Sequence, residues 1–581
     1  LKQHLQGSGQ CPCRWASCRR GRHPGSELSS YRISTSTMAE RMGTVERTGT
    51  VIVGAGVCGL QAASRLSREG LGDFVLLDKQ LSMGGVWSSF ANKSSRVQIA
   101  EVCYRPRGER VLTDFTPQEE IISEMEEVCR RDNILEKMRL GCDVVSVRDL
   151  EGEGVEVRYR DSSGLERCLL ATEDVLLCTG GLQEPRMLHF SGEDAFRGEI
   201  ILGVSSQIDR IALAGKHVAV LGMGAFAIEN ARTALLSGAA HVTIVARTVG
   251  MVIPRMMVLT GAFAIGNTLY TNDVALQRSP EDAKSGDDAK SGEDAEAVKK
   301  RAASRKMKEQ QAIFLLSQPY RYASAEHLMP KALKTGDLGQ LFAGKEGVRV
   351  PTCSDVFFLA LKLGLVDVVH GEVDSFDSEG LQVREENSAL RHVPCDVVVK
   401  CFGFEAPDRH LATMVGREQI RSPLFITERI WLMKGERNPK ISGTGVPGGS
   451  VNVSGSVYCM SDLYIEIFLH FRERREELRA IIARLPPIGI YDDNYGSMTR
   501  GLRILLDEVP AIAERAKVVR EGYGQRATSK WKRGMADVLV DNKADWEAAC
   551  AALTGGDRQA APYLWEAMLG MMGAGEAKAR L

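Results

Sequence analysis

Three glycines near the start of the chain, Gly54, Gly56 and Gly59, are spaced as G-x-G-x-x-G. An apolar run from Thr50 to Val53 precedes them, and a stretch of helical character follows them. In this arrangement the first glycine permits a tight turn, the second lets backbone approach a diphosphate, and the third lets helix and strand pack. The helix N-terminus then offers unpaired N–H groups and a partial positive charge. The spacing therefore predicts a dinucleotide-binding loop.

A carboxylate follows this loop at the distance that such a site requires. The run from Phe74 to Leu77 predicts a second strand, which ends at Asp78. A carboxylate at this point can accept hydrogen bonds from ribose hydroxyls, and it would repel a 2′-phosphate. We therefore expect the first loop to bind FAD or NAD in preference to NADP.

A second strand–loop–helix–strand unit repeats the plan with the opposite charge. Gly222 and Gly224 take the first two glycine positions, and Ala227 takes the third, which the pattern tolerates. The strand after this helix ends at Arg247, whose guanidinium could pair with a 2′-phosphate in bidentate fashion. Arg247 therefore predicts NADPH at the second loop, with Arg255 as a weaker candidate for the same phosphate.

The opposite charges at the two diagnostic positions indicate two different cofactors. A hydride donor is usually paired with a flavin, because a flavin accepts two electrons and can pass them on singly or to oxygen. The sequence thus predicts an oxidoreductase with FAD at the first loop and NADPH at the second.

The two units also predict the fold, since β-α-β units force parallel sheets. We expect an α/β protein with two Rossmann-like dinucleotide-binding domains and a helical C-terminal extension. The predicted FAD-binding domain comprises residues 49–206 and 395–475, and the NADPH-binding domain is inserted at 207–394. The C-terminal extension is expected at 485–581.

Two further segments are expected to lie outside the packed domains. Residues 1–48 are rich in Ser, Arg and Gly and predict a disordered basic tail. This tail is interpreted either as a transit segment or as translated upstream sequence, with Met38 as the true start. Residues 275–310 contain a short repeat of Asp, Ala, Lys, Ser and Gly, which predicts a flexible insertion.

The composition fits an ordinary globular protein of two or three domains. The chain has 581 residues, 44% hydrophobic and 26% charged, with a net charge of -1. This balance gives no sign of the basic stripe of a nucleic-acid-binding protein, and no apolar run is long enough to span a bilayer. The 14 scattered cysteines suggest a reducing compartment and no metal site. Cytoplasmic localisation is the default expectation, organelle targeting by the N-terminal stretch remains open, and so does homo-oligomerisation.

Further motifs strengthen the flavoenzyme interpretation. Two glycines in Gly84-Gly85-Val86-Trp87 let the chain pass close to a flat ring, and the Trp can cover apolar surface beside it. The other motifs are Cys178-Thr179-Gly180, Glu229 with Ala231 after the second loop, and Cys401-Phe402-Gly403-Phe404. With the two loops, these motifs resemble the class B flavoprotein monooxygenases over roughly residues 51–471. That group includes flavin-containing monooxygenases, Baeyer–Villiger monooxygenases and N-hydroxylating enzymes.

The resemblance implies both cofactor contacts and a reaction. It adds Gly85, Trp87, Thr179, Gly180 and Gly403 to the expected cofactor-binding residues. It implies that NADPH reduces FAD, and that the flavin captures O2 as a C4a-hydroperoxide. One oxygen atom would then pass to a small organic substrate, with N- or S-oxygenation expected first. The protein's task would be to exclude water and retain the peroxide, so few acid–base residues are needed.

The family also carries an Asn or Asp that contacts the flavin adduct in the stretch after the Trp. Asn92 and Gln98 are the candidates in this sequence. One departure from the family concerns Phe-x-Gly-x-x-x-His before the second loop, because Leu202 stands where the histidine is expected.

Three alternatives remain open at this point. The absence of the histidine makes an NADPH oxidase-like flavoprotein that releases peroxide plausible. A disulfide reductase would need a redox cysteine pair stacked on the flavin, and no second cysteine stands at a suitable spacing from Cys58. A non-catalytic, flavin-bound scaffold belongs to another class of function, and two intact glycine loops argue against it.

Overall fold

The computed structural model describes residues 45–98, 115–255, 352–405, 408–417, 419–420, 425–433, 457–485, 488–489, 505, 508–519 and 543–555, and parts of 303–336. The predicted tail lies outside these residues up to Thr44. Its last three residues, 46–48, instead begin the first strand. The insertion predicted at 275–310 lies almost entirely outside the described residues.

The first sheet carries the first glycine loop and is mixed, with a parallel centre. Its strand order is β3-β2-β1-β6-β5-β4, with β17 paired to β6. The strands β1, β2, β3, β6 and β17 run parallel where they pair, and β4, β5 and β6 form an antiparallel meander. The bounds are β1 Glu46–Val53, β2 Phe74–Asp78, β3 Met138–Leu140, β4 Asp143–Asp149, β5 Val155–Arg160, β6 Glu166–Leu177 and β17 Ile430–Leu432.

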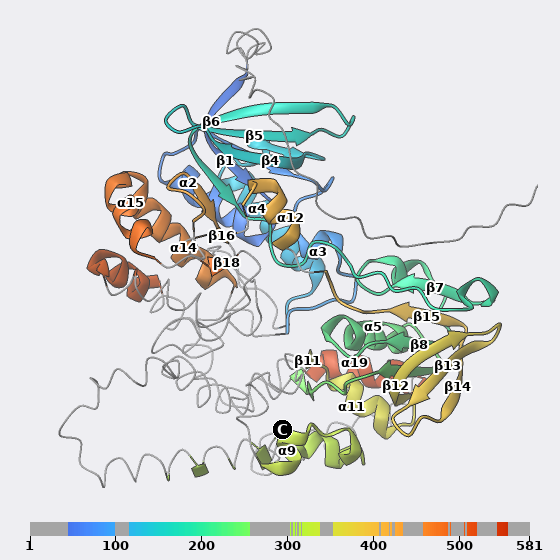
Figure 1. Ribbon diagram of the computed structural model, residues 1–581. Helices are drawn as coiled ribbons and strands as arrows, with labels where there is room; N and C mark the ends of the chain where they lie inside the picture. The colour runs from blue at the N-terminus through green and yellow to red at the C-terminus, as the bar shows by residue number, and fades with distance from the viewer. Residues whose placement is uncertain are drawn as a thin grey trace, which may run out of the picture. The chain divides into compact units, whose positions relative to one another are not determined.

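Helices cover the first sheet because each has one apolar face. In α2 (Val57–Arg68) the buried residues Leu60, Ala63 and Leu66 recur at helical spacing. They share one core with α4 (Gln118–Arg131) and α14 (Val457–Arg472). Figure 1 shows α2, α4 and α14 beside the strands of this sheet. The remaining helices of this part are α3 Val86–Ser89, α12 Asp408–Val415 and α15 Arg475–Arg484.

The second sheet carries the second glycine loop. Its strand order is β14-β13-β12-β9-β8-β15-β7, and β12, β9, β8, β15 and β7 are parallel. The strands β12, β13 and β14 form an antiparallel extension at one edge. The bounds are β7 Glu199–Leu202, β8 His217–Leu221, β9 His241–Ala246, β12 Val366–Phe376, β13 Gly380–Glu385, β14 Leu390–Pro394 and β15 Val397–Lys400.

The helix after the second loop, α5 (Ala225–Leu236), is buried on most of its sides. It packs on β8 and β9, and α11 (Asp355–Lys362) and α19 (Lys543–Leu553) also contact it (Figure 1). A helix covered in this way needs apolar residues around its circumference, and its many small and aliphatic side chains meet that need. The shorter elements are β10 Val252–Ile253, β11 Thr352–Cys353, β16 Gln419–Ile420, β18 Ile488–Gly489, α9 Lys331–Thr335, and 3-10 helices at Leu135–Lys137, Glu193–Ala195, Gln207–Arg210 and Glu326–Leu328.

The prediction of two Rossmann-like units and a helical C-terminal region is confirmed. Two strands correct the predicted domain boundaries, however. Both β7 and β15 were assigned to the first domain, yet β15 lies between β8 and β7 in the second sheet, with Val398 paired to Ala219 and to Ile200. The second domain therefore includes β7, which begins at Glu199, and β15, which ends at Lys400. The error arose because β6 and β15 have the same pattern, an apolar strand followed by a glycine turn. Each of them lies beside the glycine loop of its own sheet.

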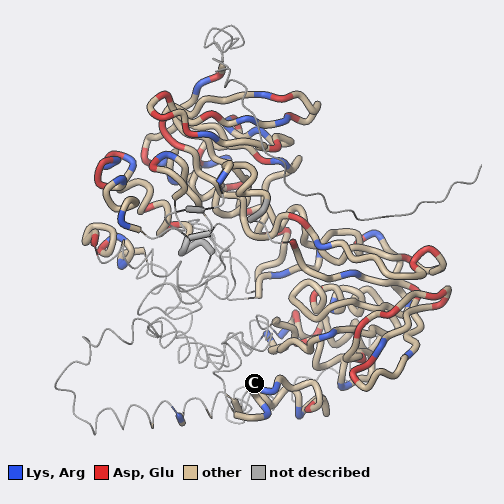
Figure 2. Tube along the Cα trace, in the orientation of Figure 1, with Lys and Arg blue, Asp and Glu red and all other residues tan. Residues whose placement is uncertain are grey.

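Charged residues of both signs are interspersed along the described chain, as Figure 2 shows. This mixture agrees with the net charge of -1. Within the described residues, no helix combines the length and apolar character needed to cross a membrane.

Candidate functional site

The first glycine loop is tightly constrained by the protein's own backbone at two of its three glycines. Gly54 has φ +110°, and a Cβ on it would lie 2.4 Å from the carbonyl oxygen of Cys178. A Cβ on Gly59 would lie 1.8 Å from the carbonyl oxygen of Gly54. At Gly56, by contrast, a Cβ would make only an ordinary contact of 3.5 Å with Cα of Gly85. Protein packing alone does not explain a glycine at position 56, whereas the approach of a diphosphate does.

The carboxylate of Asp78 holds this loop from the end of β2. It is 8% exposed; Oδ2 accepts the backbone N–H of Ala55 at 2.5 Å, and Oδ1 accepts that of Gln80 at 2.7 Å. Burial raises the pKa of Asp78, and the two N–H donors oppose that rise. The side chain therefore fixes the turn of the loop, and its contact with a ribose stays a prediction.

The Gly-Gly-x-Trp motif packs directly onto the first loop. The N–H of Gly84 donates to the carbonyl oxygen of Ala55 at 2.9 Å, and Gly85 has φ +58°. The carbonyl oxygen of Trp87 accepts a hydrogen bond from Gln118 Nε2 at 2.7 Å. These contacts place the motif at the same turn as Gly56.

Thr179 and Gly180 follow β6 on the other side of the first loop. The hydroxyl oxygen of Thr179 is buried and has no hydrogen-bond partner among the described residues. Gly180 has φ +68°, which favours glycine. An unsatisfied buried hydroxyl costs free energy unless a ligand or water meets it. This orphaned hydroxyl and the open position at Gly56 both fit a bound dinucleotide.

The second loop has the same backbone arrangement as the first. Gly222 has φ +112°, and a Cβ on it would lie 2.5 Å from the carbonyl oxygen of Cys401, just as Gly54 meets Cys178. For Gly224, no described atom lies within 4 Å of an added Cβ. Ala227 is fully buried where α5 packs on the sheet. Gly403, with φ +79°, follows β15 as Gly180 follows β6.

The N-termini of α2 and α5, the helices that follow the two glycine loops, suit an anion. Neither α2 nor α5, both fully described, carries an acidic residue in its first turn. Each helix begins after a glycine in extended conformation, so its first N–H groups are not covered by a capping side chain. Both termini can therefore donate to a diphosphate.

The structure separates the two arginines predicted for the 2′-phosphate. Arg247 directly follows β9, its side chain is 68% exposed, and its Nη1 lies 3.5 Å from Glu372 Oε1. Arg255 is only 10% exposed, and it pairs with Asp355 at 3.1 Å and Asp545 at 3.5 Å. Arg255 is therefore a buried partner of two carboxylates; its Nη1 has no hydrogen-bond partner among the described residues, and its role as a phosphate ligand stays a prediction.

Asn92 and Gln98 lie in the segment after Trp87, as predicted. Asn92 is 2% exposed, and its Oδ1 accepts hydrogen bonds from Ser94 N at 2.9 Å and Ser95 Oγ at 3.3 Å. The carbonyl oxygen of Gln98 accepts the thiol of Cys353 at 3.5 Å. The amide of Asn92 thus shapes its own turn, and the catalytic roles of both residues stay predictions.

The turn around Leu202 is closed without a histidine. The backbone N–H of Leu202 donates to Gln207 Oε1 at 2.8 Å, and Ser205 Oγ donates to the carbonyl oxygen of Leu202 at 2.6 Å. These two polar side chains hold the end of β7.

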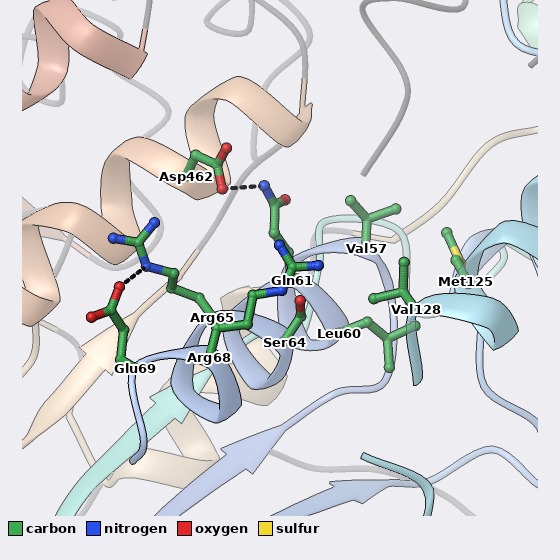
Figure 3. Close-up of a pocket in the computed structure, with 10 residues that line it drawn as sticks. All are labelled: Val57, Leu60, Gln61, Ser64, Arg65, Arg68, Glu69, Met125, Val128 and Asp462. Carbon is green, nitrogen blue, oxygen red and sulfur yellow. Dashed lines mark hydrogen bonds and ion pairs between the residues drawn. The ribbon is translucent and has the colours of Figure 1, made fainter. Parts of the chain in front are cut away.

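A small pocket lies along α2 and begins at Val57, within the first glycine loop. It measures about 120 Å³, against roughly 300–1,000 Å³ for ligand pockets in general. Its polar side chains pair with one another, Gln61 with Asp462 and Arg65 with Glu69 (Figure 3). Among the described residues, its lining includes Val57 of the first glycine loop and none of the glycines, and its small volume does not suit a dinucleotide.

Sequence reasoning missed an aromatic contact between the two loops. The ring of Phe404, just after Gly403, lies 5.0 Å from the ring of Phe90 and 5.6 Å from the ring of Phe226. Phe226 belongs to the second glycine loop, and Phe90 follows the Gly-Gly-x-Trp motif. The two motifs were visible in the sequence, but the contact joins residues more than a hundred positions apart, which no local pattern reveals.

Comparison with known proteins agrees with this geometry. Residues 48–278 match the family described as "Pyridine nucleotide-disulphide oxidoreductase". A Baeyer-Villiger monooxygenase from Streptomyces coelicolor is 29% identical over 223 residues, 38% of this chain and 41% of that protein. The "Probable flavin-containing monooxygenase 1" of Arabidopsis thaliana is 29% identical over 38% of this chain and 48% of that protein. The resemblance to class B flavoprotein monooxygenases is confirmed.

The alignments span less than half the length of these two curated relatives. Solved structures extend the likeness in fold over more of the chain. The open crystal structure of cyclohexanone monooxygenase has a TM-score of 0.53 at 18% identity, over 81% of this chain and 99% of that one. An oxidised steroid monooxygenase bound to NADP has a TM-score of 0.51 at 18% identity, over 84% and 98%. The class B fold therefore extends well beyond the segment that the sequence comparisons cover.

Proposed function

We propose that this protein is an FAD-dependent, NADPH-consuming monooxygenase that inserts one oxygen atom from O2 into a small organic substrate. One observation carries the proposal: two glycine loops of the same geometry, each open at its second glycine, are followed by opposite charges. Asp78 after the first loop suits FAD, and Arg247 after the second suits NADPH. The names of the sequence relatives support oxygen insertion.

The residues of each loop divide the work of holding a cofactor. Gly56 and the start of α2 would hold the FAD diphosphate, while Thr179 offers a buried hydroxyl beside it. Gly224 and the start of α5 would hold the NADPH diphosphate, with Arg247 on the 2′-phosphate. Bound FAD would supply the two-electron and O2 chemistry that side chains lack.

The ion pair with Glu372 competes with a 2′-phosphate for the guanidinium of Arg247. Both side chains are about two-thirds exposed, so the pair is weak in water. A dianionic phosphate competes well for a guanidinium because charge-assisted bidentate bonds are stronger. We propose that the 2′-phosphate displaces Glu372 from Arg247.

The type of oxygenation is proposed from the relatives. N- or S-oxygenation was the first expectation from the sequence, but relatives from Streptomyces coelicolor and Pseudomonas aeruginosa are both named Baeyer-Villiger monooxygenases. We therefore propose a carbonyl compound as the substrate class. N- or S-oxygenation is the second candidate, supported by the flavin-containing monooxygenase of Arabidopsis thaliana.

A disulfide-reductase activity fits the described cysteines poorly. None of the nine described cysteines is in a disulfide bond, and Cys178, beside the first loop, is buried. Burial raises the pKa of the Cys178 thiol well above its usual range. Since the thiolate is the reactive form, this cysteine is a poor redox partner.

Labelled oxygen tests the proposed reaction. The purified protein is incubated with NADPH and heavy-oxygen-labelled O2 and with a cyclic ketone, a tertiary amine or a sulfide in parallel. We expect a lactone that carries one labelled atom, detected by mass spectrometry. A labelled N-oxide or sulfoxide instead would move the assignment to the second candidate. NADPH consumption with peroxide and no labelled organic product would contradict the monooxygenase proposal and favour an oxidase.

A further inference from the structure

The segment comprising residues 90–98, here called the coupling segment, follows the Gly-Gly-x-Trp motif of the first domain. It is held to the first domain, where the N–H of Val97 donates to the carbonyl oxygen of Thr116 at 3.0 Å and the N–H of Gln118 donates to that of Ser95 at 3.0 Å, and it also contacts the second domain and the C-terminal helix α19. The backbone N–H of Lys93 donates to Asp209 Oδ2 at 3.0 Å, and the carbonyl oxygen of Ser94 accepts Arg232 Nη1 at 3.0 Å. The other contacts are Phe90 with Phe404, Asn92 with Thr233, Arg96 with Asp545, and Gln98 with Cys353.

The helix α5 connects the coupling segment to the second glycine loop. Its first residue, Ala225, directly follows Gly224, and Arg232 lies two turns further along. The next residue, Thr233, donates to the carbonyl oxygen of Glu229 at 2.9 Å and lies 3.4 Å from Asn92 Oδ1. One rigid helix therefore contacts the diphosphate position at one end and the flavin-side segment along its body.

The guanidinium of Arg232 is held in one orientation. Its side chain is 8% exposed, and Nη1 also lies 3.2 Å from Glu229 Oε1. Burial raises the pKa of Glu229 and lowers that of Arg232, because desolvation disfavours the charged form of each group. A buried pair of this kind contributes little net stability compared with apolar residues of similar volume. Its distinctive effect is geometric, because it aims Nη1 at Ser94.

The three phenylalanine rings provide a second connection between the same two places. Phe226 lies in the second glycine loop, Phe404 contacts it, and Phe90 begins the coupling segment. The polar contact through Arg232 and the aromatic contact through Phe404 therefore link the second loop to the coupling segment independently.

We propose that Arg232 is a positioning residue that ties the coupling segment to α5, so that a nucleotide at the second loop orders the segment beside Trp87. This inference rests on the proposed function for its catalytic consequence only. The coupling itself is a property of the folded protein and can be measured without turnover.

Hydrogen–deuterium exchange of the flavin-loaded protein tests the coupling directly. Arg232→Met removes the guanidinium and keeps a long apolar side chain, and Arg391→Met on the exposed face of β14 is the matched control. We expect backbone amides of residues 92–97 to exchange about fivefold faster in Arg232→Met and at the wild-type rate in the control. A fivefold change lies at the low end of the range that is typical for energetic coupling between two sites. Added NADP+ is expected to slow this exchange in the wild type and not in Arg232→Met. Unchanged exchange in Arg232→Met, or an NADP+ effect that survives the substitution, would overturn the proposal.

A kinetic measurement separates positioning from folding. In Arg232→Met we expect the product formed per NADPH consumed to fall about fivefold, while the KM for NADPH changes less than about twofold. Arg232→Lys, which keeps the charge, is expected to restore part of the yield. A loss of flavin with a parallel loss of every rate would indicate a purely structural role and contradict the inference. If the wild type consumes no NADPH, the proposed function fails, yet the exchange experiment still decides the role of Arg232.

Discussion

Gly56→Ala is expected to give a folded protein that has lost most of its flavin. Among the described residues, a Cβ at this position would meet only the backbone of Gly85, with Cα at the ordinary contact distance of 3.5 Å, so the protein can accept it. The same Cβ would stand where the backbone must approach a diphosphate. We expect FAD affinity to fall about 100-fold, which corresponds to about 2.7 kcal/mol. The ratio of flavin to protein absorbance after purification measures the loss, and circular dichroism verifies the fold.

Two matched substitutions show whether the effect is local. Gly224→Ala, which meets no described atom within 4 Å, is expected to keep its flavin and to weaken NADPH instead. Gly59→Ala would place a Cβ 1.8 Å from the carbonyl oxygen of Gly54, so it is expected to unfold the loop itself. A Gly56→Ala protein that retains one flavin per chain would contradict the assignment of the first loop.

Arg247→Ala is expected to abolish most of the preference for NADPH over NADH. The two nucleotides differ only in the 2′-phosphate, and Arg247 is the exposed cation at the end of β9. Loss of a bidentate charge-assisted contact should lower the ratio of kcat/KM for NADPH to that for NADH about 100-fold. Most of the change should appear in KM for NADPH, because the phosphate is remote from the hydride that is transferred.

Glu372→Gln provides the opposite change at the same place. It removes the carboxylate that pairs with Arg247 and competes with the phosphate, so KM for NADPH should fall modestly. Steady-state kinetics with both nucleotides measure the two variants together. An equal loss for NADPH and NADH in Arg247→Ala would show that the arginine does not recognise the 2′-phosphate.

The parts of the fold that the sequence predicts well are those governed by local spacing. The packing at Gly59 depends on Gly54 within the same strand–loop–helix unit, and the structure has both in that arrangement. The domain boundary at β15 failed for the opposite reason. Residues 396–404 resemble residues 174–181 in pattern, and only the pairing of Val398 with Ala219 and Ile200 distinguishes which sheet they join.

Long-range contacts explain the remaining differences at the site. Arg255 was a candidate phosphate ligand because it follows the second unit, and it pairs with Asp355 and Asp545, which lie 100 and 290 positions further along the chain. The docking of Ser94 on Arg232 joins residues 138 positions apart. Such partners come together only when both sheets have formed, so no spacing rule predicts them.

Anaerobic reduction followed by exposure to air tests the central claim most directly. The purified protein is expected to be yellow, to lose its flavin absorbance when NADPH is added without oxygen, and to do so much more slowly with NADH. Admission of air should restore the absorbance through a transient absorbing species, and an added ketone should shorten its lifetime. A protein without bound flavin, or one whose flavin NADPH cannot bleach, would contradict the account.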